Sequence, residues 1–429
     1  MSRKKNLLIF PAGTEIAFEI LNALKFSKFI NIYGGTSIDE HSEFVYSKLI
    51  KGFPFIGEDG FIEYLNKVIS EYNIEYIYPA HDSVSMYLAE YADKINADVI
   101  SAKYETVKIC RSKAETYDFF RNKRFVPKIY ESADAVEQYP VFVKPAVGQG
   151  SIGAKKIKNA TQLENALEQD SSLLISEYLP GMEYTVDCFT DKNRQLRVTK
   201  LRDRQRIRAG ISVRSKELPV DSDILEIANA LNQGLEFRGA WFFQVKRNIE
   251  GEYRLMEVSP RVPGTMGLSR NMGINFPLLT LFDRWGYDID IIDNEYEIML
   301  DRAFYSAYKI EYEYEHVYVD YDDTLVIDGC VNTQLLTFLY QAHQKRKKIH
   351  LLTKHKGDIY ADLKKMCISD LLFDEIKMIE MNDEKGNYIC KNAAIFIDDS
   401  YAERRKIKDV LGIPVFDVDM VESLIDWKM

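Results

Sequence analysis

The chain has 429 residues, 46% of them hydrophobic, and carries a formal net charge of -10 at pH 7. That length is enough for two or three domains, each with its own core. The negative charge argues against a protein that binds nucleic acid or an anionic membrane, because neutralising phosphate groups takes concentrated Lys and Arg. The five cysteines form no CxxC pair and the six histidines lack metal-ligand spacing, so neither a disulfide framework nor a zinc site is predicted. No apolar run reaches the roughly 18 residues of a membrane span and no signal peptide is recognisable, which predicts a cytoplasmic protein.

Four regions of different character follow one another along the chain. Residues 5–105 alternate strand-like and helix-like segments, a pattern that favours a parallel sheet with crossover helices. A charged helical segment at 106–126, closed by Pro127, predicts a domain boundary. Residues 141–275 contain mostly short strands joined by Gly- and Pro-bearing turns, which is typical of a mixed α+β domain. After a passage rich in Tyr and Glu, strand and helix alternate again, which predicts a further α/β domain of roughly 115 residues.

A glycine loop interrupts the strands of the region 141–275, in the segment VFVKPAVGQGSIGAKKI with Gly148, Gly150 and Gly153. A Walker A loop would need Lys where this chain has Ala154, and a dinucleotide-binding loop would need a helix where AKKIKN predicts a strand. Between two antiparallel strands the loop makes a flap whose backbone N–H groups can cover nucleotide phosphates. Protein kinases use such a flap, but no H-R-D or D-F-G sequence follows. The alternative for the loop alone is an ordinary Gly-rich hairpin.

Residues around the flap have the chemistry that a nucleotide needs. Lys113 lies in the charged helix and Lys144 ends the strand that enters the flap, so two ammonium groups are available for phosphates. Glu183 suits a pair of ribose hydroxyls, and an extended backbone for the adenine edge is expected at Glu177, Tyr178 and Leu179. Further on, Gln244 and Glu257 are predicted on two strands joined by a turn, an arrangement of oxygen ligands that suits Mg²⁺. A salt bridge from Glu257 to Arg261 is the alternative for that carboxylate.

This order of motifs resembles the ATP-grasp superfamily over residues 5–290, and is closest to its carbamoyl-phosphate-synthase-like and carboxylate-amine ligase branches. The resemblance implies a doubly wound pre-ATP-grasp domain at 1–105 and an ATP-grasp domain at 106–300, with a small lobe at about 115–185 and a large lobe at about 186–300. It implies ATP and Mg²⁺ (or Mn²⁺) as cofactors. The flap then includes Ser151, and Ser259 joins Gln244 and Glu257 as a metal ligand. Ser259 stands where relatives carry Asn, which implies a bridging water or a weaker second metal.

The chemistry of that superfamily is the transfer of a phosphoryl group from ATP to a carboxylate, after which an amine attacks the acyl phosphate. Arginine suits this chemistry, because its planar fork grips carboxylate and phosphoryl oxygens bidentately. Arg261 is the predicted partner of the acyl phosphate. Four further arginines share one face if they lie on one strand, although a solvated edge strand blunted by charge is the alternative. These are Arg202, Arg204, Arg206 and Arg208.

The C-terminal α/β region begins with the strand VYVDYDDTLV, which runs into several aspartates, among them Asp320 and Asp322. An EF-hand loop starting at Asp320 would need Gly and Glu where the chain has Leu325 and Val331, so calcium is excluded. The D-x-D-x-T pattern resembles the first motif of the haloacid dehalogenase (HAD) superfamily. The resemblance implies a linker at 301–314 and a Rossmann-like HAD domain at 315–429. The short segment before the next motif predicts little or no cap on this domain.

The HAD resemblance also assigns roles in phosphoryl transfer. Asp320 is the nucleophile, and Asp322 is the acid that protonates the leaving oxygen and later activates water. Thr353 and Lys391 hold the phosphoryl oxygens. The Mg²⁺ (or Mn²⁺) ligands are expected among Asp320, Asp322, Asp398 and Asp399. A degenerate domain retained for assembly is the alternative.

The complete prediction is a bifunctional enzyme, an ATP-dependent carboxylate-amine ligase fused to a Mg²⁺-dependent phosphatase. Its expected partners are a small carboxylate, an amine and a phosphorylated metabolite, with no nucleic acid and no membrane. ATP-grasp enzymes are often dimers, so a homodimer is the assembly that the resemblance suggests. Two alternatives stay open. One is an ATP-grasp phosphotransferase that releases a phosphorylated small molecule, and the other is an inactive nucleotide-binding regulatory protein.

Overall fold

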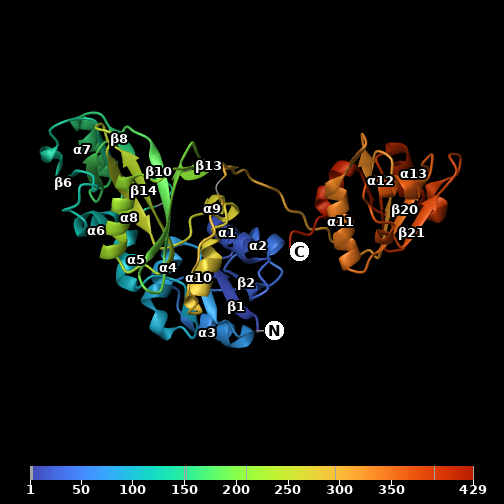
Figure 1. Cartoon of the computed structure of the whole chain (residues 1–429), viewed down its shortest axis with the longest axis horizontal. Coiled ribbons are helices and arrows are strands. Elements are labelled where there is room, and N and C mark those ends of the chain that lie inside the picture. The colour runs from blue at the N-terminus through green and yellow to red at the C-terminus, as the bar shows by residue number, and fades with distance from the viewer. Residues whose placement is uncertain are drawn as a thin grey trace. The chain divides into compact units, whose positions relative to one another are not determined.

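The computed structural model describes residues 3–148, 150, 152–208, 210–294, 296–390 and 392–428. The chain forms two compact units (Figure 1), which are described separately below. Unit 1 comprises Met1–Ser42 and Lys48–Phe304, and unit 2 comprises Glu43–Ser47 and Tyr305–Met429. In the described part of the chain, no helix is long and apolar enough to cross a membrane.

The first sheet of unit 1 has five parallel strands in the order β3-β2-β1-β4-β5. Its central strand β1 carries the apolar run LLIF, which is buried between helices on both faces because every second side chain points to each face. The carboxyl ends of β1 and β4 lead directly into α1 and α4, so both helix N-termini lie at one edge of the sheet, where parallel sheets bind ligands. The elements are β1 (Lys5–Phe10), α1 (Glu15–Leu24), β2 (Ile30–Thr36), α2 (Ser42–Val45), β3 (Leu49–Lys51), α3 (Phe61–Tyr72), β4 (Tyr76–Pro79), α4 (Asp82–Glu90), η1 (Ala92–Lys94) and β5 (Asp98–Val99).

The second sheet is antiparallel, with four strands in the order β6-β9-β7-β8. The glycine flap joins β7 to β8, and α7 packs its Leu163 and Ala166 against Val141, Val143 and Ile175. Two helices precede this sheet, and Ser112 caps the second of them by accepting a hydrogen bond from Glu115 N. The elements are α5 (Tyr104–Arg111), α6 (Lys113–Phe119), β6 (Ile129–Tyr130), η2 (Ala133–Ala135), β7 (Val141–Lys144), β8 (Lys155–Ile157), α7 (Ala160–Gln169) and β9 (Leu174–Glu177).

The third sheet of unit 1 has seven strands, with β12-β13-β11-β10-β14-β15 in line and β16 paired to β13. One face packs Val186, Cys188 and Phe243 against Ile224 and Leu231 of α8, which covers this sheet (Figure 1). The elements are β10 (Glu183–Thr190), β11 (Leu196–Asp203), β12 (Arg206–Arg208), β13 (Ile211–Leu218), α8 (Ser222–Gly234), β14 (Gly239–Arg247), β15 (Tyr253–Ser259), α9 (Gly267–Asn271), α10 (Phe276–Arg284) and β16 (Met299–Asp301).

The end of unit 1 differs from the linker that the sequence predicted at 301–314. Asp301 is the last residue of β16 and pairs with Arg214 on β13. Its carboxylate also contacts the side chains of Arg206 and Arg214 at 2.6 and 2.5 Å. These contacts hold Asp301 in the sheet, and Arg302 N also donates to Val213 O at 2.8 Å, so the first residues of the range 301–314 are attached to β13.

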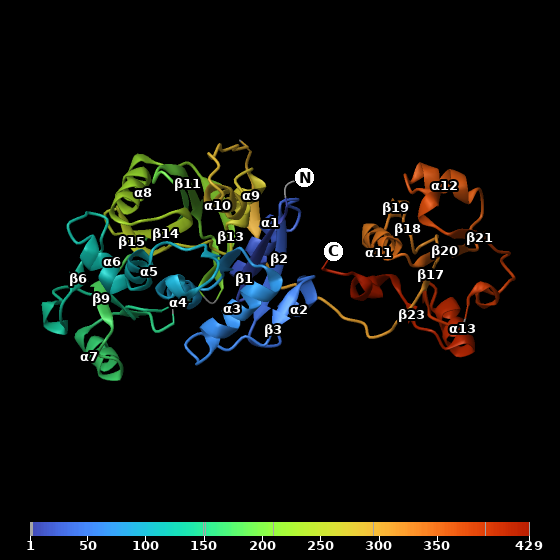
Figure 2. The same cartoon turned by 90° about the horizontal axis from the view of Figure 1, so that it is seen from below.

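Unit 2 has a five-stranded parallel sheet in the order β21-β20-β17-β22-β23. Helices α11 and α12 pack on one face and α13 on the other, as Figure 2 shows for α12 and α13. Between β17 and β20 the chain forms only a small hairpin, β18–β19, and α11. The elements are β17 (His316–Val319), β18 (Val326–Ile327), β19 (Cys330–Val331), α11 (Thr333–Gln344), β20 (Lys348–Thr353), α12 (Ile359–Lys365), η3 (Asp370–Leu372), β21 (Glu375–Met378), η4 (Lys385–Tyr388), β22 (Ala394–Ile397), α13 (Tyr401–Leu411), β23 (Val415–Phe416) and η5 (Val418–Leu424).

Candidate active sites

A cleft of about 420 Å³ in unit 1 collects several of the residues that the sequence singled out. It is lined by segments that follow β1 and β4, by the flap and by the polar face of the seven-stranded sheet. The predicted residues in its lining are Gly148, Gly150, Gln244, Glu257 and Arg261. A smaller adjoining cavity adds Lys113. The structure thus brings together residues that are far apart in the sequence.

The floor of the cleft is a row of polar residues at matching positions on four adjacent strands. Arg202 on β11 pairs with Thr185 on β10, Thr185 pairs with Gln244 on β14, and Gln244 pairs with Glu257 on β15. Residues opposite each other on neighbouring strands point to the same face of a sheet. Gln244 and Glu257 therefore point into the cleft side by side.

Gln244 and Glu257 fit a magnesium ion. Among the described residues, neither side chain has a hydrogen bond or an ion pair, although the positive charges of Lys144 and Arg261 act on the Glu257 carboxylate. Mg²⁺ in nucleotide sites takes one or two protein oxygens and completes its shell with phosphates and water. The Ser259 hydroxyl, the third predicted ligand, instead donates a hydrogen bond to Asp82 Oδ1 at 3.0 Å.

Arg261 forms a bidentate ion pair with Asp82, the first residue of α4. Its Nε and Nη2 lie 2.6 and 2.7 Å from the two carboxylate oxygens. The Glu257–Arg261 salt bridge considered from the sequence is therefore not the pair that forms. Burial raises the pKa of the Asp82 carboxyl, but the charge and hydrogen bonds of Arg261 outweigh burial and hold that pKa well below its usual range. Sequence reasoning missed Asp82, whose only signal was a carboxylate directly after a parallel strand.

Lys144 is buried at the base of the flap, where its Nζ donates a hydrogen bond to Tyr117 Oη at 2.6 Å. Burial, and then the charge of Lys113, lower the pKa of Lys144 to about 7. A buried ammonium is strongly stabilised by an anionic ligand, because the negative charge of the ligand replaces the solvation by water that burial removes. Arg111, which the sequence analysis did not single out, donates from Nη1 to the Gly148 carbonyl at 3.2 Å and lines the adjoining cavity.

The flap approaches the turn between β12 and β13. A Cβ atom added at Gly210 would lie 2.3 Å from the carbonyl carbon of Gly150. Gly210 has φ +76°, so both its backbone conformation and this close approach require glycine. Gly153, at the far end of the flap, has φ +76° as well. Ser151 lies outside the described residues.

The residues predicted to hold the nucleoside do not line the cleft. The Glu177 carboxylate accepts from Lys128 N at 2.8 Å and from Arg254 Nε at 3.2 Å, so this side chain joins strands of the protein. Lys156 Nζ lies 3.9 Å from the centre of the Tyr178 ring, and Leu179 is half-buried. Glu183 is 3.1 Å from Arg204 Nε.

The four arginines of the segment 202–208 do not share the face of one strand, which corrects the sequence prediction. Strand β11 ends at Asp203, and Arg206 begins β12 on the other side of β13. Arg202 and Arg204 line the cleft, whereas Arg206 and Arg208 are exposed. The reason is that the chain leaves β11 after Asp203 and enters β12 at Arg206, a change of strand that the alternating arginines do not indicate.

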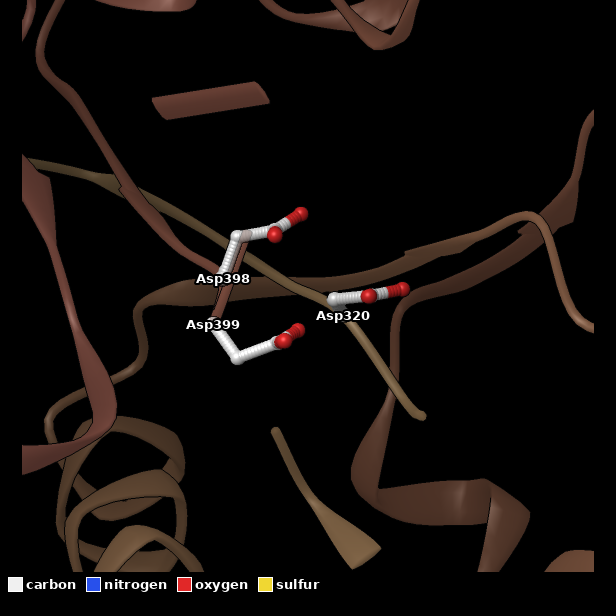
Figure 3. Close-up of side chains that lie close together, drawn as sticks. All are labelled: Asp320, Asp398 and Asp399. Carbon is white, nitrogen blue, oxygen red and sulfur yellow. The ribbon is translucent and has the colours of Figure 1, made fainter. Parts of the chain in front are cut away.

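In unit 2, three carboxylates meet at the carboxyl ends of β17 and β22. Oxygen atoms of Asp320, Asp398 and Asp399 lie within 4.8 Å of one another, and Figure 3 shows the three side chains extending to the same side. Parallel strands place their carboxyl ends at one edge, which explains why residues so distant in the sequence meet. Three hard oxygen donors suit Mg²⁺ or Mn²⁺.

Lys385 is the cation of this cluster. Its Nζ lies 2.6 Å from Asp398 Oδ2 and 3.0 Å from Asp320 Oδ1, and its side chain is only 3% exposed. Burial raises the pKa of Asp398 to about 6 and also raises that of Asp320, although Lys385 opposes both shifts. The sequence analysis assigned this place to Lys391, which lies outside the described residues. Lys385 was missed because it precedes β22 by a turn of 3-10 helix that carries no motif.

Two threonines and the second aspartate of the motif complete this site. Thr353 ends β20 and is buried, and its Oγ1 has no hydrogen-bond partner in the described chain. Thr324 accepts from Asp399 N at 2.9 Å and so holds the loop of that carboxylate. Asp322 lies outside the three-carboxylate group, because its carboxylate contacts His355 Nδ1 at 2.9 Å.

Comparisons with known proteins concern the first of these sites. Residues 169–297 match a family described as "ATP-grasp in the biosynthetic pathway with Ter operon". The chain is 38% identical over 69 residues to a D-alanine--D-alanine ligase of Marinomonas sp., covering 14% of this chain and 22% of that protein. It is 32% identical over 114 residues to the vancomycin/teicoplanin A-type resistance protein VanA of Enterococcus faecium, covering 24% of this chain and 33% of that protein. The matches thus span a third or less of these curated relatives. The crystal structure of the L-amino acid ligase from Bacillus licheniformis superimposes with a TM-score of 0.52 at 15% identity, over 66% of this chain and 74% of that one.

Proposed function

We propose that unit 1 is an ATP- and Mg²⁺-dependent ligase of the ATP-grasp type that joins a carboxylate to an amine through an acyl phosphate. The match of residues 169–297 to an ATP-grasp family supports this proposal. The observation that carries the proposal is the cleft itself. It places two metal-compatible oxygens, Gln244 and Glu257, beside the flap and close to the buried Lys144. The amino-acid ligases among the similar proteins support an amino acid as one substrate.

The residues of the cleft divide the work by charge. Lys144, Lys113 and Arg111 offer positive charge to the phosphates of ATP, and the flap offers backbone N–H groups. Glu257 and Gln244 would hold a magnesium ion, which would supply charge neutralisation at the phosphates. The substrate carboxylate attacks the γ-phosphorus and ADP leaves. The amine then attacks the acyl carbon and gives up a proton as phosphate leaves. Arg204 and Arg261 line the same cleft and offer guanidinium groups to the acyl phosphate.

The ligase is tested by release of ADP from MgATP in the presence of pooled amino acids and small carboxylic acids. We expect release to need both a carboxylate and an amine, and a condensed product to appear by mass spectrometry. Glu257→Gln should lower the rate at least 100-fold, because the metal loses a charged ligand. Glu250→Gln, in the exposed turn between the same two strands, is the matched control. A phosphorylated product without condensation would favour a phosphotransferase, and tight nucleotide binding without turnover would favour a regulatory protein.

We infer that unit 2 is a Mg²⁺-dependent phosphatase of the HAD type. The geometry supports Asp320 as the nucleophile, because its carboxylate ends the central strand beside Lys385 and the unpartnered hydroxyl of Thr353. An Asp320 oxygen attacks phosphorus while Asp322 protonates the leaving oxygen. Water then hydrolyses the aspartyl-phosphate, and Asp322 takes its proton. Asp320, Asp398 and Asp399 would hold a divalent ion, which would supply charge neutralisation.

Hydrolysis of p-nitrophenyl phosphate by the full chain with Mg²⁺ tests this second activity. Asp320→Asn should abolish it, and EDTA should do the same in the unchanged protein. The control is Asp409→Asn, which alters an exposed ion pair with Arg405 on α13. Hydrolysis that persists in Asp320→Asn would exclude the proposed nucleophile. Fusion of the two units suggests that both act on one reaction sequence.

A further inference from the structure

Three arginines of the unit 1 cleft have a buried N–H group that finds no hydrogen-bond partner among the described residues. The atoms are Arg202 Nη1, Arg204 Nε and Arg302 Nη1. Leaving such a donor unpaired costs free energy, so buried polar groups in native proteins are almost always hydrogen-bonded. Three of them in one cleft indicate that a bound ligand supplies acceptors. Arg204 Nε already lies 3.1 Å from a Glu183 oxygen, so the need is greatest at Arg202 and Arg302.

Arg202 is held rigidly in place by a carboxylate. Its Nε and Nη2 donate to the two oxygens of Asp187 at 2.9 and 3.1 Å, and both residues are buried. Asp187 neutralises the guanidinium and fixes its plane, because a bidentate pair permits one orientation. The third nitrogen, Nη1, is left for the cleft. A side chain that is 2% exposed and fixed in this way is a built site and not a flexible surface group.

Arg302 reaches the same place from the end of β16. Its backbone N donates to Val213 O at 2.8 Å, which fixes the start of the side chain. The guanidinium packs against Gly264, where an added Cβ would lie 3.1 Å from Nη1. Burial lowers the pKa of Arg302, the carboxylates of Glu15 and Glu19 raise it, and the charge of Arg202 lowers it further. Both guanidinium groups line the same cleft and the charge of Arg202 acts on Arg302, so an anion bound to both would offset their repulsion.

This position is separate from the metal end of the cleft. Arg202 and Glu257 occupy the two ends of the row across β11, β10, β14 and β15. Gln244 and Glu257, which would hold the metal, lie two and three strand spacings of about 4.8 Å from Arg202, so their backbones are roughly 10 and 14 Å away. Arg261, near the metal end, has its fork occupied by Asp82. A group bound at Arg202 is therefore not the carboxylate that receives the phosphoryl group.

We propose that Arg202 and Arg302 form a subsite for a second carboxylate, one that a substrate carries but that does not react. A carboxylate fits better than a phosphate, because Asp187, Glu15 and Glu19 already offset much of the positive charge. The inference rests on the proposed ligase function and names its substrate class. The spectator carboxylate belongs either to a dicarboxylic acid on the acid side or to an amino acid on the amine side.

Isothermal titration calorimetry on the full chain tests the subsite without turnover. The chain is first titrated with MgADP, then with matched pairs of probes that differ by one carboxylate. Glutarate against pentanoate reports the acid side, and alanine against alaninamide, in both enantiomers, reports the amine side. In one of the two arms we expect the probe with the extra carboxylate to bind at least tenfold more tightly. Arg302→Gln should remove that preference, and Arg302→Lys should restore part of it.

The outcomes separate the two proposals. If MgADP binds but no pair of probes differs in the unchanged protein, or if Arg302→Gln keeps the difference, the subsite is wrong while the nucleotide site stands. If MgADP itself does not bind, the ligase proposal fails first. Arg121→Gln, which alters an exposed ion pair with Asp118, is the control and should keep the preference. A thermal melt of each variant shows whether it is folded. If Arg302→Gln does not fold, the binding preference of Arg302→Lys decides the test.

Discussion

The imidazole of His355 lies 2.9 Å from the carboxylate of Asp322, the side chain proposed as the acid of the phosphatase reaction. Its other nitrogen lies 2.8 Å from Asp362 on α12. Burial lowers the pKa of His355, but the two carboxylates outweigh burial and raise it. The histidine thereby ties the motif loop to a helix and orients an otherwise exposed carboxylate.

His355→Gln should impair hydrolysis in a way that depends on the leaving group. A phosphate ester with a poor leaving group, such as glycerol phosphate, needs protonation by Asp322, whereas p-nitrophenyl phosphate needs little. We expect kcat to fall at least 30-fold for the first and less than threefold for the second. Steady-state kinetics on both esters measure this, with Asp322→Asn as the reference for complete loss of the acid. Equal losses on the two esters would mean that His355 has only a structural role.

Lys385→Met should abolish phosphatase activity. The change removes the ammonium that contacts both Asp320 and Asp398, so two buried carboxylates are left to repel each other. We expect at least a 100-fold loss of kcat against p-nitrophenyl phosphate, together with weaker folding. Lys391→Met is the matched comparison, because the sequence assigned the lysine that holds the phosphoryl oxygens to that position. If Lys385 fills this role, Lys391→Met should keep near-normal activity. Loss of activity in Lys391→Met, with near-normal activity in Lys385→Met, would support the role that the sequence assigned to Lys391.

Lys144→Met should stabilise the free protein and weaken nucleotide binding. The pKa of Lys144 is about 7 in the folded chain, against 10.5 for an ordinary lysine. Burying the charged ammonium therefore lowers the free energy of unfolding at neutral pH. The unfolded state binds more protons between these values, so this group makes stability rise with pH from about 7 to about 10.5. Urea unfolding should show a gain of about 1–3 kcal/mol at pH 7 in the variant, and a flatter pH profile. A less stable variant would mean that the hydrogen bond to Tyr117 outweighs the cost of burial.

Asp82→Asn should destabilise unit 1, because it leaves the Arg261 charge without its partner. The pair keeps 15% and 21% of its side-chain surface exposed, so we expect a loss of about 2–3 kcal/mol, below that of a fully buried pair. Urea unfolding of the single and double variants measures the coupling between the two residues. Replacing both partners, as Asp82→Asn with Arg261→Met, should recover more than half of the loss. Additive losses would show that the two side chains act independently.

Gly210→Ala should raise the KM for ATP. The new methyl group meets the backbone of Gly150 and prevents the flap from reaching the turn between β12 and β13. Gly251→Ala is the matched control, because Gly251 has a similar φ of +83° but nothing within 4 Å of an added Cβ. Both variants place an alanine in a left-handed backbone conformation, which destabilises the fold, and only Gly210→Ala also disturbs the flap. Equal KM values for ATP in the two variants would show that the close approach of Gly210 to Gly150 does not affect nucleotide binding.

The sequence predicted those parts of both sites that follow from local pattern. The pattern of the segment put Gln244 and Glu257 on two strands joined by a turn, and the glycines between two short strands predicted the flap. Partners brought by distant elements were out of reach. Asp82, Lys385 and Arg302 lie at the ends of elements and belong to no repeating pattern. Only the fold shows that each of them meets a group from another strand or sheet.

The pairing of β16 with β13 has a mechanical consequence. Residues that leave unit 1 are hydrogen-bonded to the same strand whose opening turn touches the flap. Asp301 strengthens the attachment by contacting Arg206 and Arg214, one on each strand of that hairpin. Tension on the chain beyond residue 304 is therefore transmitted through β16 and β13 to the turn that touches the flap, at the entrance to the nucleotide cleft.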